Sequence, residues 1–321
     1  MTPILNSNIC SIGNVSNVDK RKCCGDESLE LANFYTGTSN LNRSFEFNLK
    51  SPVPVWSSGS PRQNEVLGLS VIVLNLEAPD LLHQIYIGIE KAQNDFKESG
   101  YVLELIVGDT GSQEVEVLNL LDLIGEKYSV HRGLDYHFSK NNNYLTKYTK
   151  TSHLLFLNND VLIYKNPRAL WECFSTHLKV EQEVISSVNL LFPDLSIQHT
   201  GVDFSKKDGM ENIPFHPHSH EYLEVVKGTV KYVPAVTGAF LMTSKMLFEK
   251  IEGFDEGYNK ECQDIAYCLR ARKIDVLSRV IEVGNLIHIE NGTRPKNDYS
   301  NPDRKRFLRK FSSFIEGTLN A

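Results

Sequence analysis

The 321-residue sequence lacks any apolar run that approaches the roughly 20 residues needed for a membrane-spanning helix. Residues 1–24 also lack the basic-then-apolar layout of a secretory signal. Basic residues are not in excess, since 34 Lys and Arg stand against 40 Asp and Glu, for a formal net charge of -6. Neutralising a nucleic-acid backbone requires clustered Lys and Arg. We therefore expect a cytoplasmic protein that binds no nucleic acid.

Paired Cys-x-x-Cys motifs are also missing, which argues against a zinc ribbon although the chain has six cysteines. Three of them, Cys173, Cys262 and Cys268, lie among apolar residues of expected helices. We expect these three to be buried, reduced thiols.

Residues 1–65 have little hydrophobic periodicity and are rich in Asn, Ser, Gly and Lys. Their Pro- and Ser-rich end, residues 51–61, is typical of a linker. Two interpretations stay open for this part, a poorly ordered extension or a small cap that packs through its aromatic residues. We expect an α/β domain over residues 66–295 and a basic amphipathic helix over residues 296–321.

From residue 67 onward, short apolar runs alternate with helical patterns. We expect strands at residues 69–74, 103–107, 128–132 and 153–157, and helices at residues 80–96, 114–125 and 141–150. This alternation predicts right-handed crossovers and a mainly parallel sheet. In such a sheet, ligands bind beyond the carboxyl ends of the strands.

Polar and acidic residues follow three of the expected strands. They are Asn75–Glu77 after the first, Gly108–Ser112 after the second and Asn158–Asp160 after the fourth. Each group alone is explained by capping of the next helix or turn. Three such groups at one edge of a sheet instead favour a binding site.

Seven segments in a fixed order carry a resemblance to a known family: Ser70–Val73, Val107–Ser112, Phe138–Asn143, Leu155–Val161, Ala235–Leu241, Phe248–Glu256 and Gln263–Arg270. The set resembles glycosyltransferase family 2, including rhamnosyltransferase-like enzymes of bacterial surface polysaccharides. The resemblance covers residues 67–290 and implies a GT-A fold, an α/β architecture whose mainly parallel mixed sheet is flanked by helices.

The resemblance implies an inverting glycosyltransferase that moves a sugar from a nucleotide-sugar donor, with UDP- or dTDP-sugars favoured, to a saccharide or lipid-linked saccharide. By the same resemblance Asp109 contacts the nucleotide base and Ser112 supports its loop. Asn75 and Glu77 would line that pocket, although a solvated loop residue explains Glu77 equally well. The remaining donor-side positions are Asn142, Asn158, Asn159, Thr237 and Gly238.

A divalent cation, Mg²⁺ or Mn²⁺, would neutralise the leaving diphosphate. The family binds it through a DxD-type motif, which here reads Asn158-Asn159-Asp160. Only Asp160 is acidic, so it becomes the one strong ligand of this motif, and Asn158 is free to bond the donor. Capping of a turn is the other explanation for Asp160. The resemblance also implies that a late histidine, His288, joins the metal ligands.

The acceptor hydroxyl must lose its proton as it attacks. The family usually has Glu-Asp or Gln-Asp at the position of Gln263-Asp264, so the resemblance implies that Asp264 is the base. It lies at an expected helix start, where the helix dipole favours an anion. A plain capping role is the alternative, and Glu261 is a second candidate base. The resemblance implies that His199, Asp255 and Gln263 lie on the acceptor side. Loop fixation is an equal alternative for Asp255, and simple packing is one for His199.

The sequence His216-Pro-His-Ser-His220 allows a metal site or a mobile flap over the acceptor. Pro217 and the loop setting favour the flap. Near the C-terminus, residues 303–316 combine basic residues with a Phe- and Leu-rich stripe. They would contact an anionic membrane surface at its inner face or pack on the domain, and we favour packing.

Three other functions remain to be weighed. A catalytically inactive nucleotide-binding scaffold is suggested by the missing first Asp of the DxD-type motif. A nucleotidyltransferase would need a Gly-rich basic loop after the first strand, and residues 75–79 do not form one. A processive synthase is disfavoured because the chain has no membrane span and no QxxRW-like segment.

Overall fold

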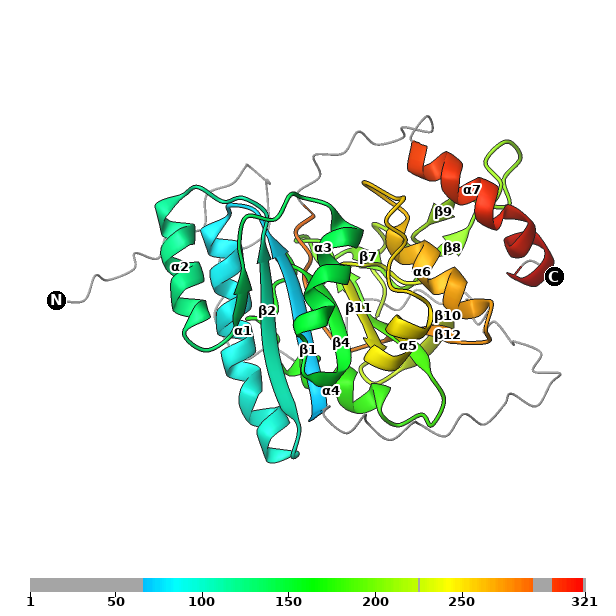
Figure 1. The fold of residues 1–321 in the computed structure, drawn as a ribbon. Helices are drawn as coiled ribbons and strands as arrows, with labels where there is room; N and C mark the ends of the chain where they lie inside the picture. Colours follow the sequence, from blue (N-terminus) through cyan, green and yellow to red (C-terminus); the bar gives the residue numbers. More distant parts are fainter. Residues whose placement is uncertain (1–65, 225, 291–301, 320–321) are drawn as a thin grey trace, which may run out of the picture. The chain divides into compact units, whose positions relative to one another are not determined.

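A computed structural model describes residues 66–224, 226–290 and 302–319 (Figure 1), all within one compact unit. The predicted N-terminal extension or cap at residues 1–65 lies outside the described residues, as does the predicted start of the last helix at residue 296.

A central eight-stranded sheet has the order β10-β12-β5-β11-β4-β1-β2-β3. Its strands are β1 (Val66–Asn75), β2 (Val102–Asp109), β3 (Ser129–His131), β4 (Thr151–Asn158), β5 (Val184–Val188), β10 (Val230–Val233), β11 (Phe240–Ser244) and β12 (Leu277–Ile281). The pairs β1–β2, β1–β4, β2–β3 and β5–β12 are parallel, whereas β11 runs antiparallel to β4 and β5, and β10 antiparallel to β12. The predicted mainly parallel mixed sheet is confirmed.

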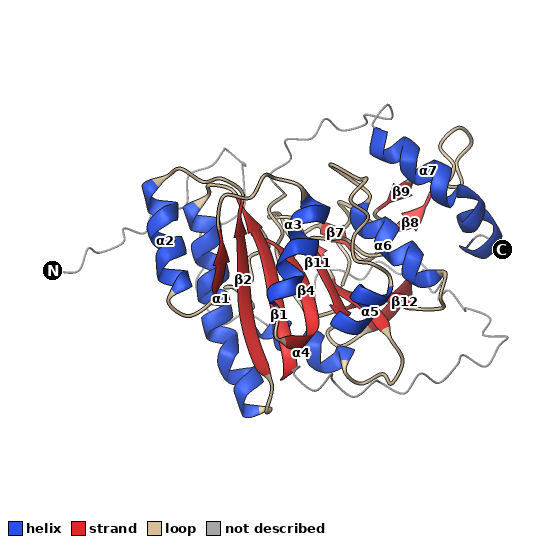
Figure 2. Ribbon diagram, in the orientation of Figure 1, coloured by secondary structure: helices blue, strands red, loops and turns tan. Residues whose placement is uncertain are grey.

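Helices cover both faces of this sheet (Figure 2). The core on one face includes α1 (Pro79–Glu98), α2 (Val115–Gly125) and α4 (Arg168–His177), and the core on the other includes α3 (Phe138–Leu145), α5 (Lys245–Lys250) and α6 (Gln263–Arg272). Successive strand residues point to opposite faces. In β1, Leu69, Val71 and Val73 therefore join the first core, whereas Ile72 joins the second.

Four very short strands form two small sheets beside the central one. Strand β6 (Leu190–Leu191) pairs with β7 (Ile197–His199), and β8 (Asp203–Phe204) pairs with β9 (Pro214–Phe215). The sequence predicted no element in this stretch.

Two predicted boundaries were wrong. Helix α3 begins at Phe138 instead of residue 141, because His137 caps it by accepting a hydrogen bond at Nδ1 from Lys140 N at 3.3 Å. It ends at Leu145 and is followed by a 3₁₀ turn, η2, at Thr146–Tyr148.

The three cysteines predicted to be buried are free thiols with buried side chains. Burial raises the pKa of Cys173 and of Cys268 to about 12. Both are therefore protonated at neutral pH, and since the thiolate is the reactive form, both are inert.

The last described helix, α7 (Pro302–Phe314), continues into a π-helical turn, η3 (Ile315–Leu319). Its apolar stripe packs inward, because Phe307, Phe311 and Ile315 are buried in a cluster with Tyr258 and with Leu269 of α6. The stripe therefore contacts protein. Within the described ranges, no helix has the length and apolar content to cross a bilayer.

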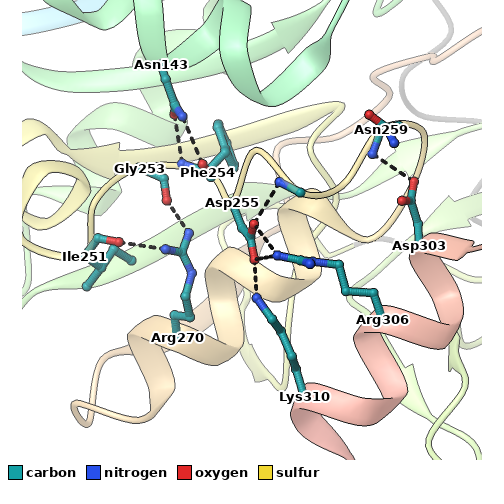
Figure 3. A network of polar contacts seen from close by, with 11 residues as sticks. Asn143, Ile251, Gly253, Phe254, Asp255, Asn259, Arg270, Asp303, Arg306 and Lys310 are labelled. Atoms are coloured by element: carbon teal, nitrogen blue, oxygen red, sulfur yellow. Dashed lines mark hydrogen bonds and ion pairs between the residues drawn. The ribbon is translucent and has the colours of Figure 1, made fainter.

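Charged residues of α7 hold the loop that precedes α6, as Figure 3 shows. Asp255 accepts hydrogen bonds from Arg306 Nη2 at 3.0 Å and from Lys310 Nζ at 2.6 Å. Asp303 Oδ2 accepts hydrogen bonds from the backbone amides of residues 259, 260 and 261, at 3.0, 2.6 and 3.1 Å. We call these contacts the α7 clamp.

The other end of the same loop is fixed by side chains of α3 and α6. Asn143 exchanges two hydrogen bonds with the backbone of Phe254, at 2.8 and 2.9 Å. Arg270 donates to the carbonyls of Ile251, at 2.8 Å, and Gly253 (Figure 3). Contacts at both ends of this loop therefore define the path of the chain into α6.

Replacing Asp255 with Asn should lower the free energy of unfolding at pH 7 by about 1 kcal/mol, because Lys310 and Arg306 lose their carboxylate. Burial by itself raises the pKa of Asp255, but Lys310, the Gly257 amide and Arg306 together lower it to about 2. Since this pKa lies below the usual 3.8, the stabilisation is complete above about pH 4 and is lost as the pH falls through 2.

Urea denaturation of the native protein and of Asp255→Asn from pH 7 downward checks this, and the difference between them should shrink below pH 4. Asp122→Asn is the matched control, since Asp122 forms one exposed pair with Arg132 at 2.7 Å. Its effect should be about 0.5 kcal/mol or less. Equal stability of Asp255→Asn and the native protein at pH 7 would contradict the clamp.

Candidate functional site

Strand register brings the predicted donor-side residues together at the carboxyl edge of the sheet. Asn75 lies opposite Asp109 in the β1–β2 pair, and Leu74 lies opposite Asn158 in the β1–β4 pair. Asn159 Nδ2 donates to Asn75 Oδ1 at 3.0 Å, which joins the ends of β1 and β4 directly. The ends of β1, β2 and β4 therefore lie together at this edge, as expected.

The loop after β2 is organised around the buried carboxylate of Asp109. It accepts hydrogen bonds from the amides of Gly111, at 3.3 Å, and Ser112, at 3.1 Å, and from the Ser112 hydroxyl. The same hydroxyl accepts from Glu77 N at 2.8 Å. Asp109 and Ser112 thus give this loop one defined shape.

Glu77 is not the solvated loop residue that was one of its two explanations. Its carboxylate accepts hydrogen bonds from Gln113 N at 2.7 Å and Glu114 N at 3.1 Å, at the start of α2. The side chain therefore ties the β1 loop to the β2 loop. Asn142, another predicted donor residue, donates to the carbonyl of Phe138 in its own helix at 3.0 Å.

The predicted metal residues form a pair, with Asp160 Oδ1 lying 3.0 Å from His288 Nε2. Behind His288, the side chain of Gln198 sets the ring tautomer. Gln198 Nε2 faces two acceptors at 3.3 Å, the carbonyl of His288 and a carboxylate oxygen of Glu290. Its Oε1 therefore faces His288 Nδ1, at 2.6 Å. Because an amide oxygen only accepts, Nδ1 carries the donated proton.

In a neutral His288 ring, Nε2 then presents a lone pair to Asp160. The amide nitrogen of Asn158 lies 3.4 Å from the same Nε2, which fits an acceptor at that position. Two acceptors 3.0 Å apart require a proton or a cation between them. A histidine whose other nitrogen donates to a fixed oxygen is also the usual arrangement of a metal ligand.

Asp160 and His288 consequently fit a divalent cation as two of its ligands. No group of three His, Cys, Asp or Glu side chains that could hold a metal occurs in the parts of the chain that the structure describes. The remaining ligands must be phosphate oxygens and water. A mixed oxygen and imidazole set suits Mn²⁺ better than Mg²⁺, which prefers oxygen alone.

Asp264 lies in the first turn of α6 and joins that helix to the β10–β11 connection. Its Oδ2 accepts a hydrogen bond from Gly238 N at 2.6 Å, and its Oδ1 accepts one from Ile265 N at 2.8 Å. The carbonyl of the next residue, Ala239, accepts from Asn158 N at 3.0 Å. Two backbone steps therefore connect the predicted base with the predicted metal side.

The donor-side residue Thr237 accepts a hydrogen bond from Ala239 N at 3.2 Å, and Gln263 is the buried first residue of α6. Asp255 lies in the α7 clamp, which is the loop-fixing role weighed for it. Glu261, the second candidate base, pairs with Arg304 of α7 at 3.0 Å. Asp264 is thus the carboxylate of this group that bonds the Gly238 loop.

Gln198, which orients His288, is a site residue that was not predicted from the sequence. Gln198 directly precedes His199, which was predicted as a site residue. Its partner His288, however, lies 90 residues later in the chain. His199 itself is buried at the end of β7 and bonds His216, Nδ1 to Nδ1, at 3.0 Å.

Comparison with known proteins bears on the fold. No family model matches the sequence. Over 241 residues, 72% of the chain, it is 27% identical to the O-antigen biosynthesis protein RfbC of Myxococcus xanthus. The chain spans only 18% of the length of that relative.

Among solved structures, GalNAc-T7 crystallised with UDP, GalNAc and Mn²⁺ matches 76% of this chain and 48% of its own, at 12% identity and a TM-score of 0.55. The chain has the GT-A fold of glycosyltransferases. TarS of S. aureus, residues 1–349, matches 70% of this chain and 61% of its own at 12% identity, with a TM-score of 0.46. The GT-A fold predicted by the resemblance is confirmed.

Substitution of Gly238 tests the contact between Asp264 and the loop in this GT-A domain. A Cβ at Gly238 would lie 3.2 Å from Asp264 Cβ and from the Phe138 ring. We expect Gly238→Ala to lower the free energy of unfolding by about 1–3 kcal/mol, because these packed neighbours must shift. Thermal unfolding measures this.

Gly125→Ala is the matched control. Its Cβ would meet only Val130 Cγ2, at 3.9 Å, and it ends helix α2, where alanine is the better helix former. This variant should be as stable as the native protein or slightly more so. The close contact at Gly238 would be refuted if both substitutions had the same effect.

Proposed function

We propose that the chain is an inverting glycosyltransferase of family 2 that acts in surface polysaccharide synthesis. It would move a sugar from a nucleotide-sugar donor, with UDP- or dTDP-sugars favoured, to a hydroxyl of a saccharide or lipid-linked saccharide. The similarity to an O-antigen biosynthesis protein supports this setting, and the GT-A fold supports the reaction.

One observation carries the proposal. The pair Asp160–His288 and the carboxylate of Asp264 are linked through the backbone of Gly238 and Ala239, by hydrogen bonds of 2.6 and 3.0 Å. A leaving-group side and a base side are therefore held in one frame, as in-line transfer between donor and acceptor requires.

In this reading a divalent cation held by Asp160 and His288 supplies charge neutralisation for the leaving diphosphate. The Asp109 carboxylate and the loop around it would receive the nucleotide base. Asp264 takes the proton of the attacking hydroxyl. One base opposite one leaving group gives a single displacement with inversion at the sugar carbon.

We also propose a place at the inner membrane surface for a lipid-linked acceptor. The apolar stripe of α7 is buried, whereas Lys305 and Arg309 on the same helix are exposed. Contact with anionic lipids would therefore be electrostatic and salt-dependent, without insertion of the helix.

The alternative is an inactive GT-A module that binds a nucleotide. It is favoured by Asn158, which stands where the DxD-type motif has a carboxylate. Against it, Asp160 and His288 remain paired at 3.0 Å, in an arrangement that suits two ligands of a cation.

A panel of UDP- and dTDP-sugars with p-nitrophenyl glycosides as acceptors tests the activity, with and without Mn²⁺. We expect Asp264→Asn to lower the transfer rate at least about 100-fold, which is the usual contribution of a general base, with donor affinity nearly unchanged. The exposed Asp208→Asn is the control and should transfer at the native rate. Normal transfer by Asp264→Asn would remove Asp264 as the base.

The metal assignment has its own test. Replacing Asp160 with Asn should weaken Mn²⁺-dependent binding of UDP at least about tenfold, because the one anionic ligand is lost. Titration calorimetry with UDP, with and without Mn²⁺, measures this, and binding without the metal should be the same in both proteins. If Mn²⁺ strengthens UDP binding equally in both, Asp160 does not hold the metal.

A further inference from the structure

A pair of histidines lies beside the proposed site and has no role in the mechanism above. His199 ends strand β7 and is 1% exposed, and its Nδ1 lies 3.0 Å from Nδ1 of His216. The two rings meet edge to face with centroids 5.1 Å apart. His216 follows β9 and is exposed to solvent. A buried imidazole therefore supports an exposed one.

The second nitrogen of His199 makes no hydrogen bond to a described residue that would explain a histidine at this position. Its Nε2 is buried and has no hydrogen-bond partner among the described residues. Leaving a buried polar atom unpaired is unfavourable, so a Phe or Leu would fill this position at lower energy. The Nδ1 contact with His216 is the one polar interaction that accounts for histidine at this position.

The segment that carries His216 is fastened to β7 by its backbone. His220 N donates to the carbonyl of Ile197, and Ile197 N donates to the carbonyl of Glu221, both at 2.8 Å. The ring of His220 also stacks on Phe192 with centroids 4.4 Å apart. The segment predicted as a flap is thus bonded to β7 through its backbone, and its His216 ring contacts His199.

The backbone places the histidine pair near the loop that holds the proposed base. Val202, three residues after His199, donates a backbone hydrogen bond to the carbonyl of Ala235 at 2.8 Å, and Ala235 lies three residues before Gly238. Although the residue is exposed, the protein packed around its ring lowers the pKa of His216, while the nearby charges of Asp264 and Glu290 oppose that shift. Burial and the neighbouring rings hold the pKa of His199 well below its usual value. Both rings are therefore neutral near pH 7.

We propose that His199 is a positioning residue that presents His216 to the acceptor, on the side of the site that holds Asp264. This rests on the proposed function. A neutral imidazole offers one donor, one acceptor and a flat face, which suits a polyhydroxylated saccharide. A metal site is not favoured, because Pro217 separates His216 from the next histidine and no three-ligand group occurs in the described ranges.

The test compares the Michaelis constants for acceptor and donor in His199→Phe, which keeps the ring shape and removes both nitrogens. With a p-nitrophenyl glycoside as acceptor, its KM for the acceptor should rise about tenfold, while the donor KM and nucleotide release without acceptor stay at native values. His199→Asn, which retains a polar atom near the Nδ1 position, should recover most of the loss. The exposed His83→Phe on α1 should match the native protein.

A double variant separates positioning from general loss of packing. Since His199 acts through His216, adding His199→Phe to His216→Ala should change the acceptor KM no further. Additive effects of the two substitutions, or an unchanged acceptor KM in His199→Phe, would overturn the proposal. If His199→Phe does not fold, His216→Ala with native kinetics would overturn it equally. A native protein that transfers no sugar at all would instead refute the proposed function.

Discussion

The hydrogen bond between Asp264 and the amide of Gly238 is the contact on which the site depends. It joins helix α6 to the connection that precedes β11, and β11 lies antiparallel against β4. The carbonyl of Ala239 also accepts a hydrogen bond from Asn158 N. The position of Asp264 is therefore fixed relative to the strand end that carries Asp160. Gly238 is needed because a side chain there would meet Asp264 itself.

Everything around α6 serves to keep this bond in place. The residue before the helix, Cys262, has a positive φ of 68°, an unfavourable conformation for a side-chain-bearing residue. Such a conformation persists only where its surroundings enforce it. The α7 clamp holds the amides of residues 259–261, and Asn143 holds Phe254. The C-terminal helix therefore acts on the site through the path of the chain, without touching it.

The parallel half of the sheet was predictable because its signal is local. The apolar runs at β1, β2 and β4 are buried on both faces, and the rule for carboxyl ends then located Asn75, Asp109 and Asp160. The detailed roles were not predictable, because they depend on partners distant in sequence. Glu77 bonds the start of α2, about 36 residues away, and Gln198 orients His288 across 90.

The same reason explains the parts that were missed. Strands β6 to β9 are two or three residues long, too short for any hydrophobic period to appear. The histidine loop was visible in the sequence, but its attachment to β7 depends on backbone hydrogen bonds to Ile197, which no side-chain pattern encodes. Helix α3 began early because a histidine caps it, a residue outside the usual capping set.

In the proposed mechanism one carboxylate, Asp264, works opposite one leaving group, so that the sugar carbon is attacked once. The anomeric configuration of the product tests this most directly. Proton NMR of the product of a single donor, recorded before mutarotation or further reaction, should give the configuration opposite to that of the donor. A product with the configuration of the donor would contradict the account, because retention requires either a second displacement or attack from the leaving-group face.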